Sequence, residues 1–254
     1  MRNGEDVDNH AKHPDIELMK AEKDYAGLVA ALEHPVKDVR KMAVEALWEM
    51  EVLPHASRSV PVGDLPRMMM LLKDEDKDTS DYAAEVLRGL PPGGVGKVLV
   101  VTGAVPILVK LLDERDKRIR LRAVWVLWRI GEEGETSALV KGGAVPQLIN
   151  CLDDADAGVQ GYAAWTLWRL SDRGHAEEVV KNGVIRKLVK WVGSGDKNMR
   201  LHAAWALGNL AQKGYDKAIA DSGCVEKLKI MIEKDPSEDV RIVAKEVLGK
   251  IMPD

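Results

Sequence analysis

The chain has 254 residues, of which 46% are apolar and 31% are charged, and its formal net charge at pH 7 is −4. A slightly acidic chain has no bulk attraction for nucleic acid or anionic membrane surfaces, so we expect neither as a partner. Its apolar stretches are too short to cross a bilayer, and its polar N-terminus predicts no signal peptide.

The chain begins with a polar segment and a short helix. Residues 1–14 have no apolar core and predict a flexible tail, and residues 15–23 predict a short capping helix. From there a 40-residue period governs the sequence. It aligns three columns, which are Gly63, Gly103, Gly143, Gly183 and Gly223; Leu28, Met68, Leu108, Leu148, Leu188 and Leu228; and Leu47, Leu87, Leu127, Leu167 and Leu207.

A fixed period of this length is typical of stacked helical repeats, in which each unit buries its apolar face against its neighbours. We therefore expect a single repeat domain over residues 15–254. Its six units are centred near residues 24–53, 64–90, 95–131, 135–171, 175–211 and 215–252.

Each of the later units predicts three helices. In the fourth unit Gly134 ends the preceding helix, residues 136–141 form a short helix, and Gly143 marks the bend into the second. An acidic loop then leads into the third and longest helix. Three of these third helices share one pattern of two small residues, tryptophan and leucine, in residues 121–130, 161–170 and 201–210.

The third helices have two contrasting faces. At about 100° per residue, the apolar residues of one arc predict the stripe that is buried against the rest of the repeat, and they are Ala123, Val126, Leu127 and Ile130. Tryptophan and arginine lie on the opposite side of the same helix. Because stacked repeats place their third helices in parallel, we expect these side chains to form a ladder on one surface.

Two motifs connect this pattern with a known family. Gly-Ala-Val-Pro-x-Leu-(Val/Ile)-x-x-Leu occurs at residues 103–112 and 143–152, and Ala-Ala-Trp-x-Leu begins at residues 163 and 203. Together they resemble the armadillo repeat, and Asp-Val-Arg at residues 38–40 and 239–241 is similar to HEAT repeats. The resemblance implies an all-α, right-handed α-solenoid of about six armadillo/HEAT-like repeats. It also implies that the third helices line a concave groove that binds proteins or extended peptides.

The candidate partner-binding groove consists of the polar and aromatic side chains on three successive third helices. They are Arg122, Trp125, Trp128, Arg129, Tyr162, Trp165, Trp168, Arg169, His202, Trp205 and Asn209. Tryptophan and arginine are enriched at binding hot spots, which favours a binding role. An alternative stays open, in which the tryptophans fill gaps between adjacent units and the arginines are merely solvated.

The groove residues also suggest what kind of ligand to expect. In related armadillo proteins a tryptophan is followed four residues later by an asparagine that holds the backbone of the ligand, and only Trp205 with Asn209 retains that pair here. The other two rows carry Arg129 and Arg169 instead. Guanidinium groups favour carboxylates, so we expect an acidic or mixed-charge protein segment, its negative part between the rows of Trp125 and Trp165.

We find no constellation that predicts catalysis, and we expect no metal ion and no cofactor. The six histidines, His10, His13, His34, His55, His175 and His202, share no metal-ligand spacing. Cys151 and Cys224 occupy positions where other repeats carry mostly apolar or small residues. They predict buried thiols in a reducing, cytoplasmic setting.

The favoured function is therefore a non-catalytic adaptor or scaffold. Two alternatives belong to other classes. One is an enzyme of the HEAT-like DNA glycosylase type, for which Arg122, Arg129 and Arg169 would supply phosphate contacts, although it also requires a carboxylate among the aromatic residues. The other resembles HEAT-repeat lyase-like or assembly subunits, which handle a prosthetic group.

Overall fold

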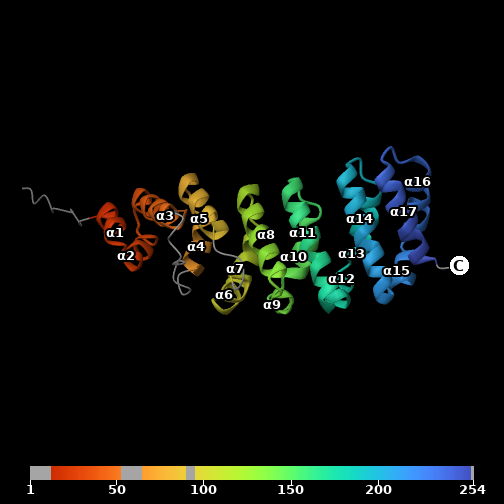
Figure 1. The fold of residues 1–254 in the computed structure, drawn as a ribbon, viewed down its shortest axis with the longest axis horizontal. Helices are drawn as coiled ribbons and strands as arrows, with labels where there is room; N and C mark the ends of the chain where they lie inside the picture. Colours follow the sequence, from red (N-terminus) through yellow and green to blue (C-terminus); the bar gives the residue numbers. More distant parts are fainter. Residues whose placement is uncertain (1–12, 53–64, 90–94, 253–254) are drawn as a thin grey trace, which may run out of the picture. The chain divides into compact units, whose positions relative to one another are not determined.

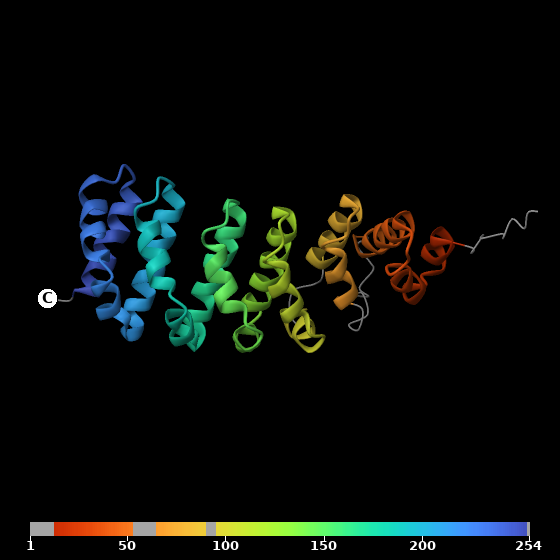
Figure 2. The ribbon, with the colours of Figure 1, turned by 180° about the vertical axis from the view of Figure 1, so that it is seen from behind.

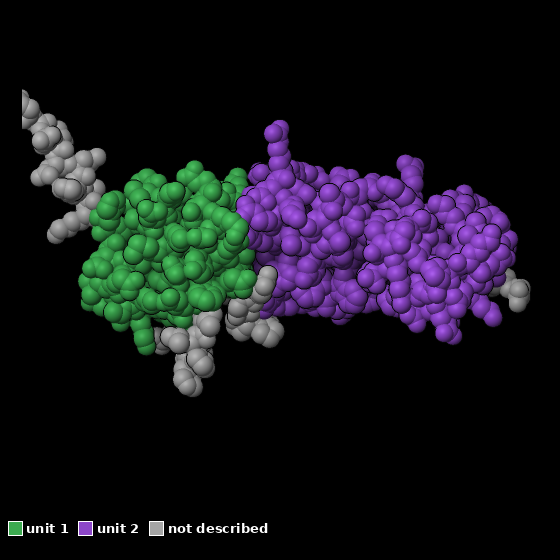
Figure 3. Space-filling view, turned by 90° about the horizontal axis from the view of Figure 1, so that it is seen from above, with its two compact units in different colours: residues 1–91 green, residues 92–254 purple. Residues whose placement is uncertain are grey.

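The computed structural model describes residues 13–52, 65–89 and 95–252. Within these ranges the chain forms helices and no strands, which confirms the all-α prediction. The chain divides into two compact units, Met1–Pro91 and Pro92–Asp254, coloured separately in Figure 3. A single domain over residues 15–254 stays a prediction. None of the described helices is long and apolar enough to cross a bilayer.

The first unit contains one short helix and two helix-pair repeats. They are α1 (Ile16–Glu22), α2 (Tyr25–Ala31), α3 (Lys37–Val52), α4 (Leu65–Leu71) and α5 (Lys77–Gly89). Helix α1 confirms the short helix expected at residues 15–23, and Asp15 caps it by accepting a hydrogen bond from the Leu18 amide at 3.0 Å. Most of the expected tail, residues 1–12, lies outside the described residues.

The second unit contains four repeats of three helices each. They are α6 (Val95–Val101), α7 (Ala104–Leu111) and α8 (Lys117–Glu132); α9 (Thr136–Lys141), α10 (Ala144–Cys151) and α11 (Ala157–Leu170); α12 (Ala176–Lys181), α13 (Val184–Val192) and α14 (Lys197–Leu210); and α15 (Asp216–Asp221), α16 (Cys224–Lys234) and α17 (Glu238–Ile251). The third helices α8, α11, α14 and α17 stand in that order along the unit in both views (Figures 1 and 2).

Acidic residues at a 40-residue spacing start three of these third helices. The side chains of Asp116, Asp156 and Asp196 accept hydrogen bonds from the amides of Arg118, Gly158 and Met199 at 2.8–2.9 Å. These amides belong to the first helical turn, which has no helical acceptor for them. The acidic loops of the sequence are therefore the start signals of the long helices.

The repeat columns form the core of each unit. Leu28 and Leu47 in the first unit and Leu108, Leu127 and Leu148 in the second are fully buried. The stripe expected on α8 is confirmed, since Ala123, Val126, Leu127 and Ile130 are all buried. Glycine at the bend before each second helix has a structural reason, because Gly143 has a φ of 77°, which side chains disfavour.

Both cysteines are buried thiols, as the sequence predicts. Burial raises the pKa of Cys151 to about 12 and that of Cys224 to about 11. Neither thiol is therefore ionised near neutral pH, and neither is a nucleophile there. Both side chains fill space in the core of the second unit.

Buried ion pairs join consecutive repeats within each unit. Arg40 pairs with Asp74 at 2.7 Å, Arg120 with Asp154 at 2.6 Å and Arg200 with Asp235 at 2.6 Å. The three pairs have the same geometry, in which each carboxylate accepts from two nitrogens of its guanidinium. The third guanidinium nitrogen of each arginine, Nη1, donates to carbonyl groups of the preceding loop. These arginines tie one repeat to the loop of the next.

Gly208 on α14 departs from the repeat pattern for a steric reason. A Cβ atom at this position would lie 2.9 Å from Cγ2 of Val247 on α17. Trp128 and Trp168 occupy the equivalent positions of earlier repeats. Helix α17 thus approaches α14 more closely than a tryptophan would allow.

We expect Gly208→Trp, which restores the repeat pattern, to lower the free energy of unfolding by about 2–3 kcal/mol, because overpacking a filled interface costs about that much. Urea denaturation of the purified variant measures it. Gly249→Trp is the control, since Gly249 is the equivalent residue of α17 and a Cβ there meets no atom within 4 Å. Equal stability of the two variants would mean that Gly208 is not required by packing.

Candidate functional site

Helices α11 and α14 contact each other less extensively than the other neighbouring third helices of the second unit do. Helix α8 packs along α11, and α14 packs along α17, whereas α11 and α14 contact each other at few positions. A pocket of about 330 Å³ opens between them. Pockets of a few hundred cubic ångströms suit a small molecule or a large inserted side chain.

We call this opening the aromatic pocket. It is lined by aromatic, small and polar residues. The lining residues are Trp165, Trp168, His202 and Trp205; Gly161, Ala164 and Ala206; and Asn209, Gln212 and Lys250. Five of the eleven predicted groove residues therefore meet in one cavity, and they come from two consecutive repeats.

Two of the tryptophans that line the pocket are unusually exposed. Trp165 is 44% exposed and Trp205 is 49% exposed. Trp168 packs beside Trp165 with ring centroids 5.1 Å apart, and His202 lies 6.0 Å from the ring of Trp205. Burial lowers the pKa of His202, which favours its neutral form. The pocket therefore presents apolar ring surface rather than a strong positive charge at this wall.

A carboxylate that the sequence did not suggest reaches the edge of the pocket. Glu132, at the end of α8, accepts hydrogen bonds from Nε1 of Trp165 at 2.8 Å and from Nε of Arg169 at 2.9 Å. A second Arg169 nitrogen donates to the other oxygen of the same carboxylate. Burial would raise the pKa of Glu132, but the hydrogen bonds from Arg169 and Trp165 outweigh it and lower the pKa. Glu132 is thus an anion held between two predicted site residues.

The predicted site residues on α8 pack against one another and against Tyr162 on α11. Trp128 lies 5.5 Å from the ring of Tyr162 on α11, and the guanidinium of Arg129 lies 5.7 Å from the ring of Trp125. Arg122 is half-buried, and burial lowers its pKa. Of these five residues, none lines the aromatic pocket. For Trp128 and Tyr162 the alternative interpretation, in which aromatic rings fill the space between repeats, describes the structure.

Arg129 and Arg169, which the sequence suggests for a ligand carboxylate, are both paired within the chain. Arg169 pairs with Glu132, and Nε of Arg129 lies 3.5 Å from Oε1 of Glu133. Glu133 is the i+4 neighbour of Arg129, a spacing that the sequence contains. The pairing of Glu132 with Arg169 joins two repeats, so the spacing within one helix could not reveal it.

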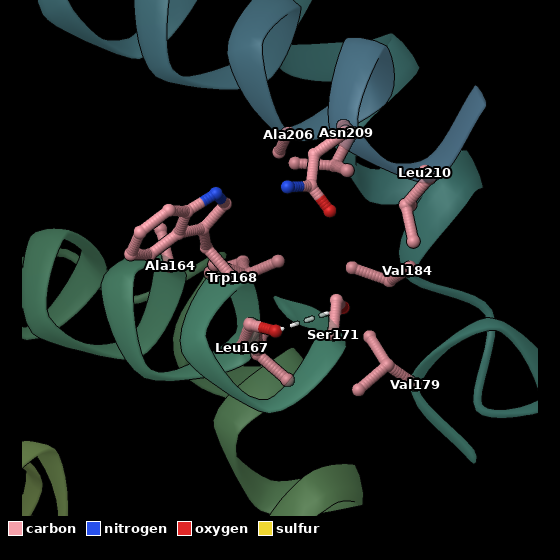
Figure 4. Close-up of a pocket in the computed structure, with 11 residues that line it drawn as sticks. Ala164, Leu167, Trp168, Ser171, Val179, Val184, Ala206, Asn209 and Leu210 are labelled. Atoms are coloured by element: carbon pink, nitrogen blue, oxygen red, sulfur yellow. Dashed lines mark hydrogen bonds between the residues drawn. The ribbon is translucent and has the colours of Figure 1, made fainter. Parts of the chain in front are cut away.

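Asn209 joins the aromatic pocket to a smaller cavity behind it. This cavity, of about 20 Å³, lies between the same repeats and is lined mostly by apolar side chains, among them Leu167 and Val184. Oδ1 of Asn209 is buried and has no hydrogen-bond partner among the described residues. Figure 4 shows this oxygen turned toward Val184 and Ser171, while the hydroxyl of Ser171 is engaged with the Leu167 carbonyl at 2.9 Å. Asn209 thus retains unused hydrogen-bonding capacity on the side of the smaller cavity.

In the described ranges, no group of three or more histidine, cysteine, aspartate or glutamate side chains is placed to hold a metal ion. His10 and His55 lie outside the described residues. His202, the one histidine in the predicted site, faces an aromatic wall instead.

Family models match most of the second unit. A model of armadillo/β-catenin-like repeats matches residues 97–131, and a model of HEAT repeats matches residues 145–249. No curated protein matches the sequence.

Solved structures give the same fold over almost the whole chain. An engineered protein is 27% identical, with a TM-score of 0.68, over 90% of this chain and 96% of its own. A designed armadillo repeat protein in complex with the peptide (KR)4 is 21% identical, with a TM-score of 0.72, over 89% of this chain and 98% of its own. Another, computationally designed for modular peptide recognition, is 20% identical with a TM-score of 0.72, over 88% and 98%. The chain belongs to the armadillo/HEAT family of α-helical repeat proteins.

Proposed function

We propose that this protein is a non-catalytic adaptor or scaffold that holds an extended segment of another protein across the third helices of its second unit. The aromatic pocket is the observation that carries the proposal. Two half-exposed tryptophans, Trp165 and Trp205, flank an opening that accommodates one large side chain. Tryptophan is the residue type most often found at energetic centres of interfaces.

The pocket suggests an anchor side chain that is long and apolar at its root. Indole faces attract aliphatic and aromatic groups, and they also attract the stem of a lysine or arginine. The complex of a designed armadillo protein with (KR)4 supports a peptide ligand of this kind. An acidic segment is a less favourable ligand, because Glu132 and Glu133 already pair with the arginines of the two rows.

Asn209 supplies the contact that an extended ligand requires. In related armadillo proteins the equivalent asparagine holds the ligand backbone, and here Asn209 lines the aromatic pocket one helical turn after Trp205. The backbone of a peptide that enters the pocket would meet this side chain among the lining residues. Backbone recognition at one asparagine and side-chain recognition in one pocket together define a short binding motif.

Selection from a random peptide library tests the proposal. We expect the purified protein to enrich peptides that share one large apolar or basic residue and that compete with one another for a single site. Isothermal titration should then give one peptide per protein molecule. Enrichment without any shared residue, or no enrichment at all, would contradict the proposal.

One observation favours a nucleic-acid enzyme as second candidate. Glu132 places a carboxylate against Trp165, as that alternative requires. However, Glu132 is ion-paired with Arg169, and Arg129 with Glu133, so neither arginine is available to neutralise a phosphate. Binding of duplex DNA that weakens steeply with salt would support the enzyme instead of the adaptor.

We also propose a reducing, cytoplasmic setting for the protein. Cys151 and Cys224 are both free and buried, and each sits in the core of a different repeat. Proteins that fold in oxidising compartments more often pair their cysteines. Location of a tagged protein in cells tests this proposal directly.

A further inference from the structure

We infer that Glu132 is the residue that sets the charge selectivity of the aromatic pocket. This inference rests on the proposed peptide-binding function. It states that the carboxylate of Glu132 keeps Arg169 occupied, so that Arg169 does not draw an acidic ligand side chain to the pocket. It also states that the same carboxylate fixes the ring of Trp165 as a wall of the pocket.

The contacts of Arg169 carry the first part. Two of its nitrogens donate to the two oxygens of Glu132, so the forked face of the guanidinium is already used. The central carbon of the guanidinium, Cζ, lies 5.4 Å from the ring centroid of Trp168. Bidentate pairing is the arrangement through which arginine recognises carboxylates most strongly. A ligand carboxylate would therefore have to displace Glu132 or bind beside a like charge.

The contact of Trp165 carries the second part. Its side chain is 44% exposed, yet its indole N–H donates to Glu132 at 2.8 Å. An exposed tryptophan without such a contact can change rotamer, whereas this ring is held at one edge by the preceding repeat. Pre-organisation of this kind reduces the entropy that a ligand must remove on binding. Glu132 is thus a positioning residue for Trp165.

Charge supports the same conclusion. Glu132 and Arg169 compensate each other's charge, so the ion pair that contacts Trp165 and Trp168 carries no net charge. Removal of the carboxylate leaves the guanidinium beside Trp168 without its hydrogen-bonded anion. A pocket with a free, stacked guanidinium favours a ligand carboxylate, so the selectivity should reverse when Glu132 is replaced.

Two variants of Glu132 separate the roles of charge and position. Glu132→Gln keeps an oxygen that accepts from Trp165 but removes the negative charge. Glu132→Ala removes both. Glu226→Gln is the control for the loss of one negative charge, because Glu226 is exposed on α16 and pairs with Lys229.

The experiment compares two peptides that differ at one position. The first is a peptide selected on the wild-type protein, and the second carries glutamate in place of its anchor residue. We expect the wild type and Glu226→Gln to prefer the first peptide by at least tenfold. Glu132→Ala should lose or reverse that preference. Glu132→Gln should accept the glutamate peptide more readily than the wild type does.

The outcomes are distinguishable. If the wild type binds selected peptides and Glu132→Ala keeps the wild-type preference, this inference is overturned and the proposed function stands. If the wild type binds no peptide of the library, the proposed function fails and the selectivity inference falls with it. An unchanged position of the Trp165 indole signal in the ¹⁵N spectrum of Glu132→Ala would overturn the positioning role on its own.

Discussion

Replacement of Arg200 by alanine is expected to lower the free energy of unfolding by about 3–5 kcal/mol, the usual cost of removing one partner from a buried ion pair. The side chains of Arg200 and Asp235 are only 10% and 4% exposed. Nε donates to Asp235 at 2.6 Å, and Nη1 donates to the carbonyls of Ser194 and Gly195 at 3.0 Å. Alanine would leave the carboxylate buried without its cation and two carbonyls without their donor.

Denaturation in urea, followed by helical circular dichroism, measures this effect. The matched control is Lys197→Ala on the same helix, because Lys197 pairs with Asp239 in an exposed position and exposed pairs contribute little. Its denaturation midpoint should stay close to that of the wild type. If Arg200→Ala were as stable as Lys197→Ala, the ion pair of Arg200 with Asp235 would not stabilise the contact between these repeats.

The same pair predicts a dependence on pH. Burial would raise the pKa of Asp235, but hydrogen bonds from Arg200 and the Ser237 amide outweigh it and lower the pKa below its usual value. Asp154 shows a lowered pKa too, mainly because Arg120 donates to it. A carboxyl whose pKa is lower in the folded state stabilises the fold above its unfolded pKa, and that contribution disappears as the pH falls through the folded value. Acid should therefore loosen the contacts between these repeats.

The double replacement Trp165→Ala/Trp205→Ala is expected to weaken peptide binding by at least about 100-fold. Each tryptophan is a hot-spot candidate, for which truncation costs about 2 kcal/mol or more, and about 1.4 kcal/mol corresponds to tenfold in affinity. Both side chains are half-exposed, so their removal deletes ligand contacts rather than core contacts. Isothermal titration with a selected peptide measures the loss.

The control for this variant removes equally exposed apolar side chains outside the pocket. Ile230 on α16 and Ile242 on α17 are 55% and 52% exposed, and neither lines the aromatic pocket. Ile230→Ala/Ile242→Ala should bind the peptide as the wild type does. Equal affinities for the wild type and the double tryptophan variant would remove the aromatic pocket from the binding surface.

The fold could be predicted from the sequence because the same residue pattern recurs every 40 residues. The 40-residue columns of glycine and leucine correspond to bends and core positions, and even the short helix at residues 15–23 is present. The ion pair of Arg200 with Asp235 was not predicted. Its partners are 35 residues apart, so they belong to different repeats, and no single unit contains the complete contact.

The site could be predicted only in part, for a related reason. Helical periodicity identified which side chains leave the core, and Trp165 and Trp205 are indeed exposed. It could not show that Glu132 crosses from α8 to occupy Arg169, since that contact depends on how closely two repeats approach. Nor could it show that the pocket opens between α11 and α14, because the distance between two helices depends on residues of both repeats.

The most direct test of the peptide site is a ¹⁵N spectrum of the tryptophan indole groups during titration with a selected peptide. The account predicts that the signals of Trp165, Trp168 and Trp205 shift in proportion to bound peptide. Trp191 provides an internal reference, because it is buried and its Nε1 donates to the Leu152 carbonyl at 3.1 Å. Shifts at Trp191 or Trp48, with the three pocket signals unmoved, would contradict the account.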